Sequence, residues 1–164
     1  MYRILVPLFA VVLFFLEPTF SLFSPIYVKG EFYVLVPHFF IVYLVFLASY
    51  STRKEAILYG VVFGLLYDMY HIDIIGVYTL IYPLLAWIAS SIVRHIHRHF
   101  VIVLVTAIVL VTFAEILSYG FAYAASFTTI SIQPFLLNRL LPTTIANTIF
   151  ILLFGWLFRY IIVE

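Results

Sequence analysis

The stretch FVIVLVTAIVLVTFAEILSYGFAYA, residues 100–124, decides the fold class of this chain. It is an apolar run in which Glu115 is the only charged side chain. A helix needs about 20 mostly apolar residues to cross the hydrocarbon core of a bilayer. The run is also continuous, whereas the strands of a membrane barrel alternate between apolar and polar residues. It therefore predicts a membrane-spanning helix and an all-α integral membrane fold.

The composition of the whole chain supports this fold class. Hydrophobic residues make up 66% of the 164 residues and charged residues 9%, against roughly 45–50% and 25% in an average globular domain. A soluble fold of this size could not cover so much apolar surface. The chain has no cysteine, which excludes disulfides, thiolate metal sites and cysteine nucleophiles. The net charge of +1 gives no reason to expect a nucleic-acid partner.

Charged residues and helix breakers divide the rest of the chain into further apolar segments. We predict one transmembrane domain over residues 1–164, a compact bundle of six transmembrane helices joined by short connections. The expected spans are 4–22, 32–50, 56–70, 74–93, 100–124 and 139–158.

The distribution of Lys and Arg predicts the orientation, because cytoplasmic loops carry an excess of both. With six crossings and a cytoplasmic N-terminus, most of them lie on the inside. These are Arg3, Arg53, Lys54, Arg94, Arg98 and Arg159, whereas Lys29 and Arg139 lie outside. Both termini are then expected in the cytoplasm.

The third span is the shortest, since its uncharged part, residues 56–67, gives only about 18 Å of helix at ~1.5 Å per residue. A re-entrant hairpin is the alternative. It would reverse every later segment and divide the Lys and Arg residues evenly between the two sides. The six-span arrangement keeps the excess of Lys and Arg on the cytoplasmic side. We therefore expect a short third span that is shielded by protein.

A stripe of small residues runs along this third span. Ala56, Gly60, Gly64 and Asp68 recur every four residues, so they share one helix face. Small residues let another helix approach closely. Two interpretations stay open: a partner helix packs on the stripe and meets Asp68, or the stripe packs within the chain and Asp68 caps the next segment.

Four ionisable groups are expected inside the membrane, where they are costly and usually face protein or water. Glu115 and Arg139 belong to neighbouring spans and are expected to form an internal ion pair. A proton relay, a ligand carboxylate, or exposure to an outer vestibule are the alternatives for Glu115. Glu17 is expected near the outer end of the first span, and His38 as a hydrogen-bonded core residue.

The last span opens with a polar stretch that contains Pro142 and Asn147. Pro142 is expected in the first helical turn, where its missing N–H does no harm. Asn147 must then find a hydrogen bond in the bundle or on another helix. Our candidates for a partner interface are Gly60, Gly64, Asp68, Gly76 and Asn147.

The densest polar cluster is a basic patch that contains Arg94, His95, His97, Arg98 and His99. Its alternating histidines would align on a strand but not on a helix, which disfavours a zinc site. We expect a cytoplasmic patch that touches anionic membrane lipids or docks a cytoplasmic partner. Known catalytic motifs are absent, so we expect no enzyme, cofactor or metal.

The motif Gly64-Leu-Leu-Tyr-Asp68, followed by Gly76-Val-Tyr-Thr-Leu80, resembles the central signature of MreD, a family of rod shape-determining membrane proteins. The span around Glu115 and the stretch from Leu141 to Asn147 are also similar to that family. The resemblance implies a non-enzymatic scaffold of the cell-elongation machinery, which builds the peptidoglycan wall, in the bacterial cytoplasmic membrane.

The resemblance also implies partners. It implies an MreC-like protein, with RodA, its transpeptidase and MreB in the same complex. The family is similar in fold to the substrate-binding subunits of energy-coupling-factor transporters. This similarity supplies the alternative function, a membrane subunit that binds a small vitamin near the outer surface. The hydroxyl-rich segment 125–138 keeps this alternative open.

Overall fold

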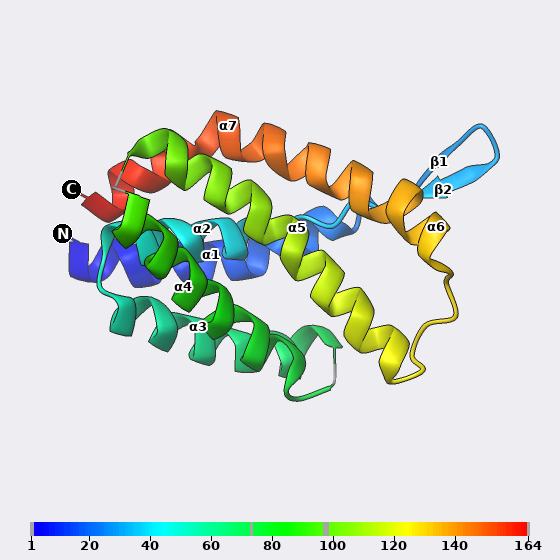
Figure 1. The fold of residues 1–164 in the computed structure, drawn as a ribbon, viewed down its shortest axis with the longest axis horizontal. Helices are drawn as coiled ribbons and strands as arrows, with labels where there is room; N and C mark the ends of the chain where they lie inside the picture. The colour runs from blue at the N-terminus through cyan, green and yellow to red at the C-terminus, as the bar shows by residue number, and fades with distance from the viewer. Residues whose placement is uncertain (1, 73, 97–98, 164) are drawn as a thin grey trace.

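The computed structural model describes residues 2–72, 74–96 and 99–163 of the chain. These residues form an elongated bundle of helices, with both ends of the chain at one end of the bundle and a small β hairpin at the other (Figure 1). Among the described residues, four helical stretches are long and apolar enough to cross a membrane. They are α1 (Tyr2–Ser21), α4 (Val77–Ile96), α5 (Phe100–Ala124) and the stretch Ile132–Val163.

Two of these helices can be compared directly with the expected spans. The helix expected over residues 100–124 is present with those bounds as α5. The last helix is longer than the expected 139–158. It consists of α6 (Ile132–Phe135), a π-helical turn η2 (Leu136–Leu140) and α7 (Leu141–Val163) in direct succession. Pro134 lies in its first turn, where a proline is well accommodated, so the helix can begin before Arg139.

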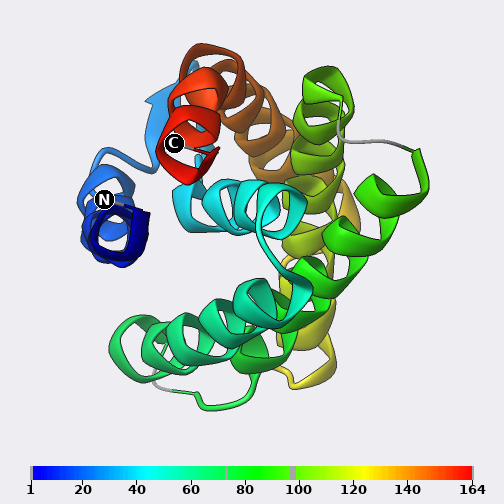
Figure 2. The same cartoon turned by 90° about the vertical axis from the view of Figure 1, so that its left-hand side faces the viewer.

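Helix α2 (Phe39–Tyr50) lies in the middle of the bundle, in contact with α1, α4, α5 and α7 (Figure 2). Its residues from Phe39 to Ser49 are all buried, as expected for a helix that is apolar on every side. With 12 residues, it extends only about 18 Å at ~1.5 Å per residue. Alone, it is therefore too short to cross a bilayer.

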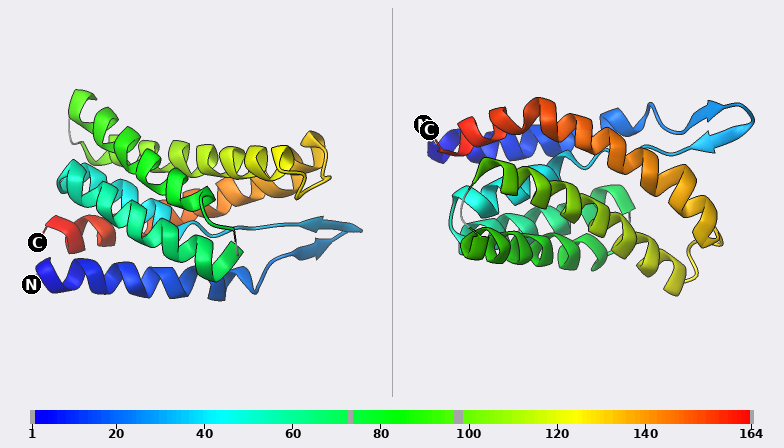
Figure 3. Two further views of the ribbon diagram at one scale, coloured as in Figure 1. Left: turned by 90° about the horizontal axis from the view of Figure 1, so that it is seen from below. Right: turned by 45° about the horizontal axis from the view of Figure 1, so that its top comes forward.

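The start of α2 corrects the expected second span, which began at residue 32. Strands β1 (Ile26–Val28) and β2 (Glu31–Tyr33) form an antiparallel hairpin that projects from the bundle (Figure 3). Lys29 and Gly30 make its two-residue turn with φ of 50° and 91°, as this tight turn requires. Residues 34–38 are not helical, because Pro37 interrupts a helix and favours extended backbone before it.

Helices α3 (Arg53–Tyr67) and α4 pack closely against each other. The side chain of Thr52 caps the start of α3 by accepting a backbone N–H. The helix ends in a π-helical turn, η1 (Asp68–Ile72). Helices α3 and α4 thus begin and end a few residues away from the ranges 56–70 and 74–93 that were expected for the third and fourth spans.

Candidate functional site

The extended segment, residues 34–38, carries the chain from the hairpin to α2 along the surface of the last helix. The Val34 N–H donates to the Asn138 carbonyl at 2.8 Å. The Thr143 hydroxyl accepts the Val36 N–H at 3.1 Å and donates to the Val34 carbonyl at 3.2 Å. Non-helical backbone is tolerated at membrane depth only where protein or water satisfies it. The last helix supplies the extended segment with backbone hydrogen bonds that the segment would have made within itself if it were helical.

Pro142 explains why a carbonyl of this helix is available. A proline has no N–H, and its ring displaces the carbonyl four residues earlier, which here belongs to Asn138. That carbonyl instead accepts the Val34 N–H. The expectation that Pro142 lies in a first helical turn is corrected, because the helical stretch already begins at Ile132.

Asn147 holds the other end of the extended segment. Its side-chain oxygen accepts the His38 N–H at 2.9 Å. Its Nδ2 donates to the carbonyls of Val36 at 2.8 Å and Thr143 at 2.9 Å. Asn147 is 2% exposed. It therefore takes the internal one of its two expected roles.

Glu17 satisfies a backbone group at the N-terminus of α2. Its Oε2 accepts the Phe40 N–H at 3.0 Å, and the residue is buried. The first N–H groups of a helix have no partner within the helix and form its positive end. Helix α1 continues through Pro18 to Ser21, so Glu17 lies inside α1 and faces the start of α2.

Glu115 joins three segments of the bundle. The expected ion pair is present, with Arg139 Nε donating to Glu115 Oε2 at 2.9 Å. The structure adds His38, whose Nε2 lies 2.6 Å from Glu115 Oε1. The Glu115 side chain is 0% exposed and that of Arg139 38%. Because a buried charge without a partner is strongly destabilising, we infer that these contacts tie α5 to η2 and to the start of α2.

Asp68 caps the N-terminus of α4. Its Oδ1 accepts the Tyr78 N–H at 2.8 Å. Its Oδ2 accepts the N–H groups of Gly76 at 2.8 Å and Thr79 at 2.9 Å, and the Thr79 hydroxyl at 2.7 Å. Gly76 has a φ of 120°, a conformation that favours glycine. The Asp-to-Gly motif therefore builds the turn into α4.

The small-residue stripe faces α4. A Cβ atom added to Gly60 would lie 2.8 Å from the Pro83 nitrogen, and one added to Gly64 would overlap the Tyr78 carbonyl. Neither position has room for a side chain without a shift of α4. In this fold, Gly60, Gly64 and Asp68 are internal, which is the second of the two interpretations drawn from the sequence.

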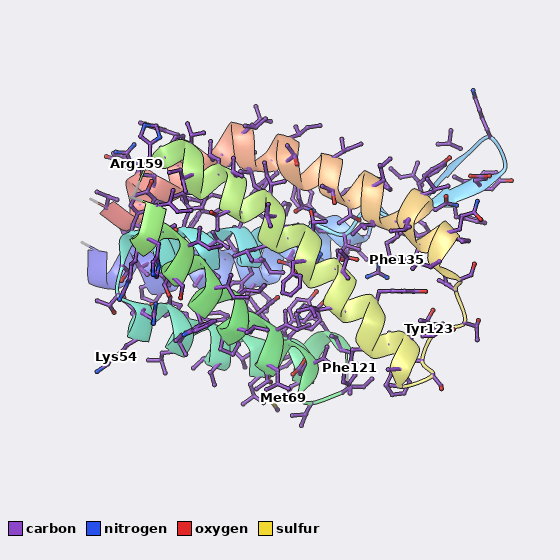
Figure 4. The ribbon with its side chains drawn as sticks, in the orientation of Figure 1. Lys54, Met69, Phe121, Tyr123, Phe135 and Arg159 are labelled. Atoms are coloured by element: carbon purple, nitrogen blue, oxygen red, sulfur yellow. The ribbon has the colours of Figure 1, made fainter. Side chains whose placement is uncertain are left out.

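Basic side chains gather at the end of the bundle that holds the chain ends, where Figure 4 shows Lys54 and Arg159. Arg53 donates from Nε and Nη2 to the hydroxyls of Ser90 and Ser91, both at 3.0 Å. The guanidinium of Arg159 lies 5.9 Å from the ring centre of Tyr50. Of the expected basic patch, Arg94, His95 and His99 are described, whereas His97 and Arg98 lie outside the described residues.

The buried ionisable groups can be compared by the partners that they bind. Within the described part of the chain, no three His, Cys, Asp or Glu residues are placed to hold a metal ion. Glu17, Asp68 and Glu115 each bind donors from another segment. His38 Nδ1 and the Tyr82 hydroxyl are buried and have no hydrogen-bond partner among the residues that the structure describes. The bonded carboxylates of Glu17, Asp68 and Glu115 therefore hold the starts of α2 and α4 and the contact between α5 and η2 in place.

Sequence reasoning did not identify the contact between His38 and Glu115 or the two bonds of Thr143. The available signal was Pro37, which interrupts the apolar run just before His38. It indicates a break in the second span, where backbone groups need outside partners. It does not indicate that those partners lie on the last helix.

The comparisons with known proteins point to one family. A family model described as "rod shape-determining protein MreD" matches residues 2–163. The "Rod shape-determining protein MreD" of Bacillus subtilis (strain 168) is 30% identical over 114 residues, which cover 70% of this chain and 66% of that protein. The "Cell shape-determining protein MreD" of Streptococcus pneumoniae (strain ATCC BAA-255 / R6) is 30% identical over 125 residues, 76% of either chain. No solved structure matches the chain.

Proposed function

The chain belongs to the MreD family of rod shape-determining proteins, and from this premise we propose that it is a membrane scaffold of the bacterial cell-elongation machinery. It binds an MreC-like partner in the cytoplasmic membrane and catalyses no reaction. RodA, its transpeptidase and MreB belong to the same complex in this proposal.

The observation that carries the proposal is the use of the buried carboxylates. Glu17, Asp68 and Glu115 are each bonded within the chain. The long helices present exposed apolar side chains outside, such as Val109 on α5 and Leu152 on α7. Helices associate in lipid through such packed surfaces with few polar contacts, so the outer surface suits partner helices.

We further propose a single domain with six crossings and both ends in the cytoplasm. The extended segment lengthens the path of α2, and α3 crosses as the short, shielded span. The positions of Lys54 and Arg159 at one end of the bundle support this orientation (Figure 4), because positive charge gathers on the cytoplasmic side.

Cysteine labelling in sealed cells tests the orientation, since the chain contains no cysteine. Lys29→Cys, in the hairpin turn, is expected to react with an impermeant thiol reagent. Lys54→Cys is expected to react only after the cells are opened. Labelling of Lys54→Cys in sealed cells would contradict the six-crossing arrangement.

Co-purification tests the scaffold function. The tagged chain is expressed with the MreC-like protein of the same organism, solubilised in a mild detergent and captured. We expect a stable complex, and no shift of the melting temperature with a panel of vitamins. Ligand at 100 times its Kd would stabilise the chain by about 2.7 kcal/mol. A clear shift with one vitamin, together with no captured partner, would favour the transporter subunit and overturn the scaffold.

A further inference from the structure

A crevice of about 340 Å³ opens between the end of α1, the extended segment and α7. Its volume falls at the lower end of the roughly 300–1,000 Å³ of small-molecule sites. Within the described part of the chain, no charged side chain lines it. Its lining includes five phenylalanines, Phe20, Phe23, Phe39, Phe150 and Phe154, and its two polar side chains are Ser24 and Asn147.

The five phenylalanines form a continuous wall. The ring centres of Phe39 and Phe150 are 4.2 Å apart, and those of Phe20 and Phe39 are 5.2 Å apart. Phe23 extends the wall from Phe20, and Phe154 extends it from Phe150. Each ring packs against at least one neighbouring ring, so the wall of the crevice is already formed in this structure.

The rim of the crevice is continuous with the outside of a helix that is apolar enough to cross a membrane. Ile149, Leu153 and Phe154 line the crevice and are 55%, 70% and 44% exposed. They belong to α7, whose exposed side chains face the hydrocarbon of the bilayer in our arrangement. The crevice therefore opens sideways into lipid at the middle of α7, beside the end of α1 and the first strand of the hairpin.

We propose that this crevice binds one acyl chain of a phospholipid from the leaflet on the hairpin side. An empty space beside lipid would leave the crevice-facing sides of the five rings uncovered, which forfeits the dispersion contacts of those sides. Water gains little there, because a buried water needs two to four polar partners. A hydrocarbon chain fills the space without leaving a polar group of its own unpaired. The lipid chain thereby packs α1 against α7 over the extended segment, whatever partner the protein binds.

A tryptophan reporter tests the proposal in the intact chain. Trp87 and Trp156, which are both exposed, are first replaced by Phe. Phe154→Trp then places the reporter at the rim, and Phe113→Trp serves as the matched control on α5, with exposed fractions of 44% and 36% for the native residues. Both variants are reconstituted in phosphatidylglycerol vesicles with brominated acyl chains, which quench tryptophan fluorescence.

The bilayer is then dissolved in an excess of unbrominated detergent. We expect the fluorescence of Phe113→Trp to recover at once and that of Phe154→Trp to recover at least about tenfold more slowly, as for a bound chain with a long residence time. Equal recovery at the two positions would overturn the proposal.

A variant that fills the crevice provides a second measurement. Ala146 lines the crevice, so Ala146→Phe should exclude the lipid chain and make the reporter at position 154 recover as fast as the control. Ala124→Phe, at the exposed end of α5, should leave the slow recovery unchanged. Native mass spectrometry of the unmodified chain is expected to show one retained phospholipid. A chain that retains no lipid, or that carries a polypeptide there instead, would contradict the proposal even if Ala146→Phe did not fold.

Discussion

The backbone N–H groups at the starts of α4 and α2 find their hydrogen-bond partners in different ways. At α4, Asp68 accepts the N–H groups of residues that lie 8 to 11 positions along the chain. At α2, the Asn147 and Thr143 side chains come from a helix more than 100 residues away, with separations of 107 to 111. The first start is a local turn, whereas the second exists only after the bundle has assembled. This difference predicts which substitutions act locally and which loosen the whole fold.

The largest effect is expected where α3 touches α4. Gly64→Ala adds one methyl group at a point where the Tyr78 carbonyl leaves no room. We expect a loss of about 3 kcal/mol of stability, at the upper end for overpacking. Thermal unfolding of the purified chain in detergent measures it. Gly120→Ala adds the same group to α5 in open space and should leave the melting temperature unchanged or higher. Equal melting temperatures for the two variants would show that α3 and α4 do not pack this closely.

The next largest effect distinguishes the start of α2, whose partners are distant in the sequence, from the start of α4, whose partner is local. Asn147→Leu leaves the His38 N–H and the Val36 carbonyl without their side-chain partner. Because unpaired buried polar groups are costly, we expect a loss of about 2 kcal/mol. Thr148→Val removes only a bond to a carbonyl within α7 and serves as the control.

Hydrogen exchange adds the structural readout for the Asn147→Leu variant. Faster exchange is expected in the extended segment and at the start of α2, and unchanged exchange at the start of α4. Exchange that increases equally at both helix starts would show that the two regions are not independent, contrary to the comparison.

The smallest effect on stability is expected for the ion pair between Glu115 and the partly exposed Arg139. A double-mutant cycle with Glu115→Gln and Arg139→Gln measures the coupling of the two residues. We expect about 1 kcal/mol, because the exposed part of Arg139 is screened by solvent. A parallel cycle with Glu115→Gln and His38→Gln should give a larger coupling, since both side chains are buried. A larger coupling of Glu115 to Arg139 than to His38 would contradict this prediction.

The same contrast explains what the sequence could predict. The Asp68 cap and the Glu115–Arg139 pair were among its expected outcomes, because their partners lie on adjacent segments. The helix over residues 100–124 could be predicted from the length and apolar composition of that stretch alone. The early start of the last helix was missed, because Pro134 was not weighed as a helix-starting residue. The late start of α2, at Phe39 instead of residue 32, was missed as well, although Pro37 indicated it.

The contacts of the extended segment could not be predicted at all from one sequence. Thr143 and Asn147 look like ordinary polar residues near a helix start, and nothing in their spacing names residues 34–38 as their partners. Pro142 shows the limit most clearly. Its ring frees the Asn138 carbonyl by a local rule, but only the assembled bundle shows that Val34 takes that carbonyl.

A crosslinking measurement tests the contact between the extended segment and the last helix most directly. Val34→Cys and Asn138→Cys are combined in the chain, which has no native cysteine, and a protease site is placed between α4 and α5. The backbone bond between the two positions is 2.8 Å long, so a short thiol crosslinker in native membranes should join them and keep the two fragments together after cleavage. Val34→Cys with Ile149→Cys, about 16 Å further along the helix at ~1.5 Å per residue, should not crosslink. Crosslinking of the control pair but not of the first pair would contradict the placement of the extended segment on the last helix.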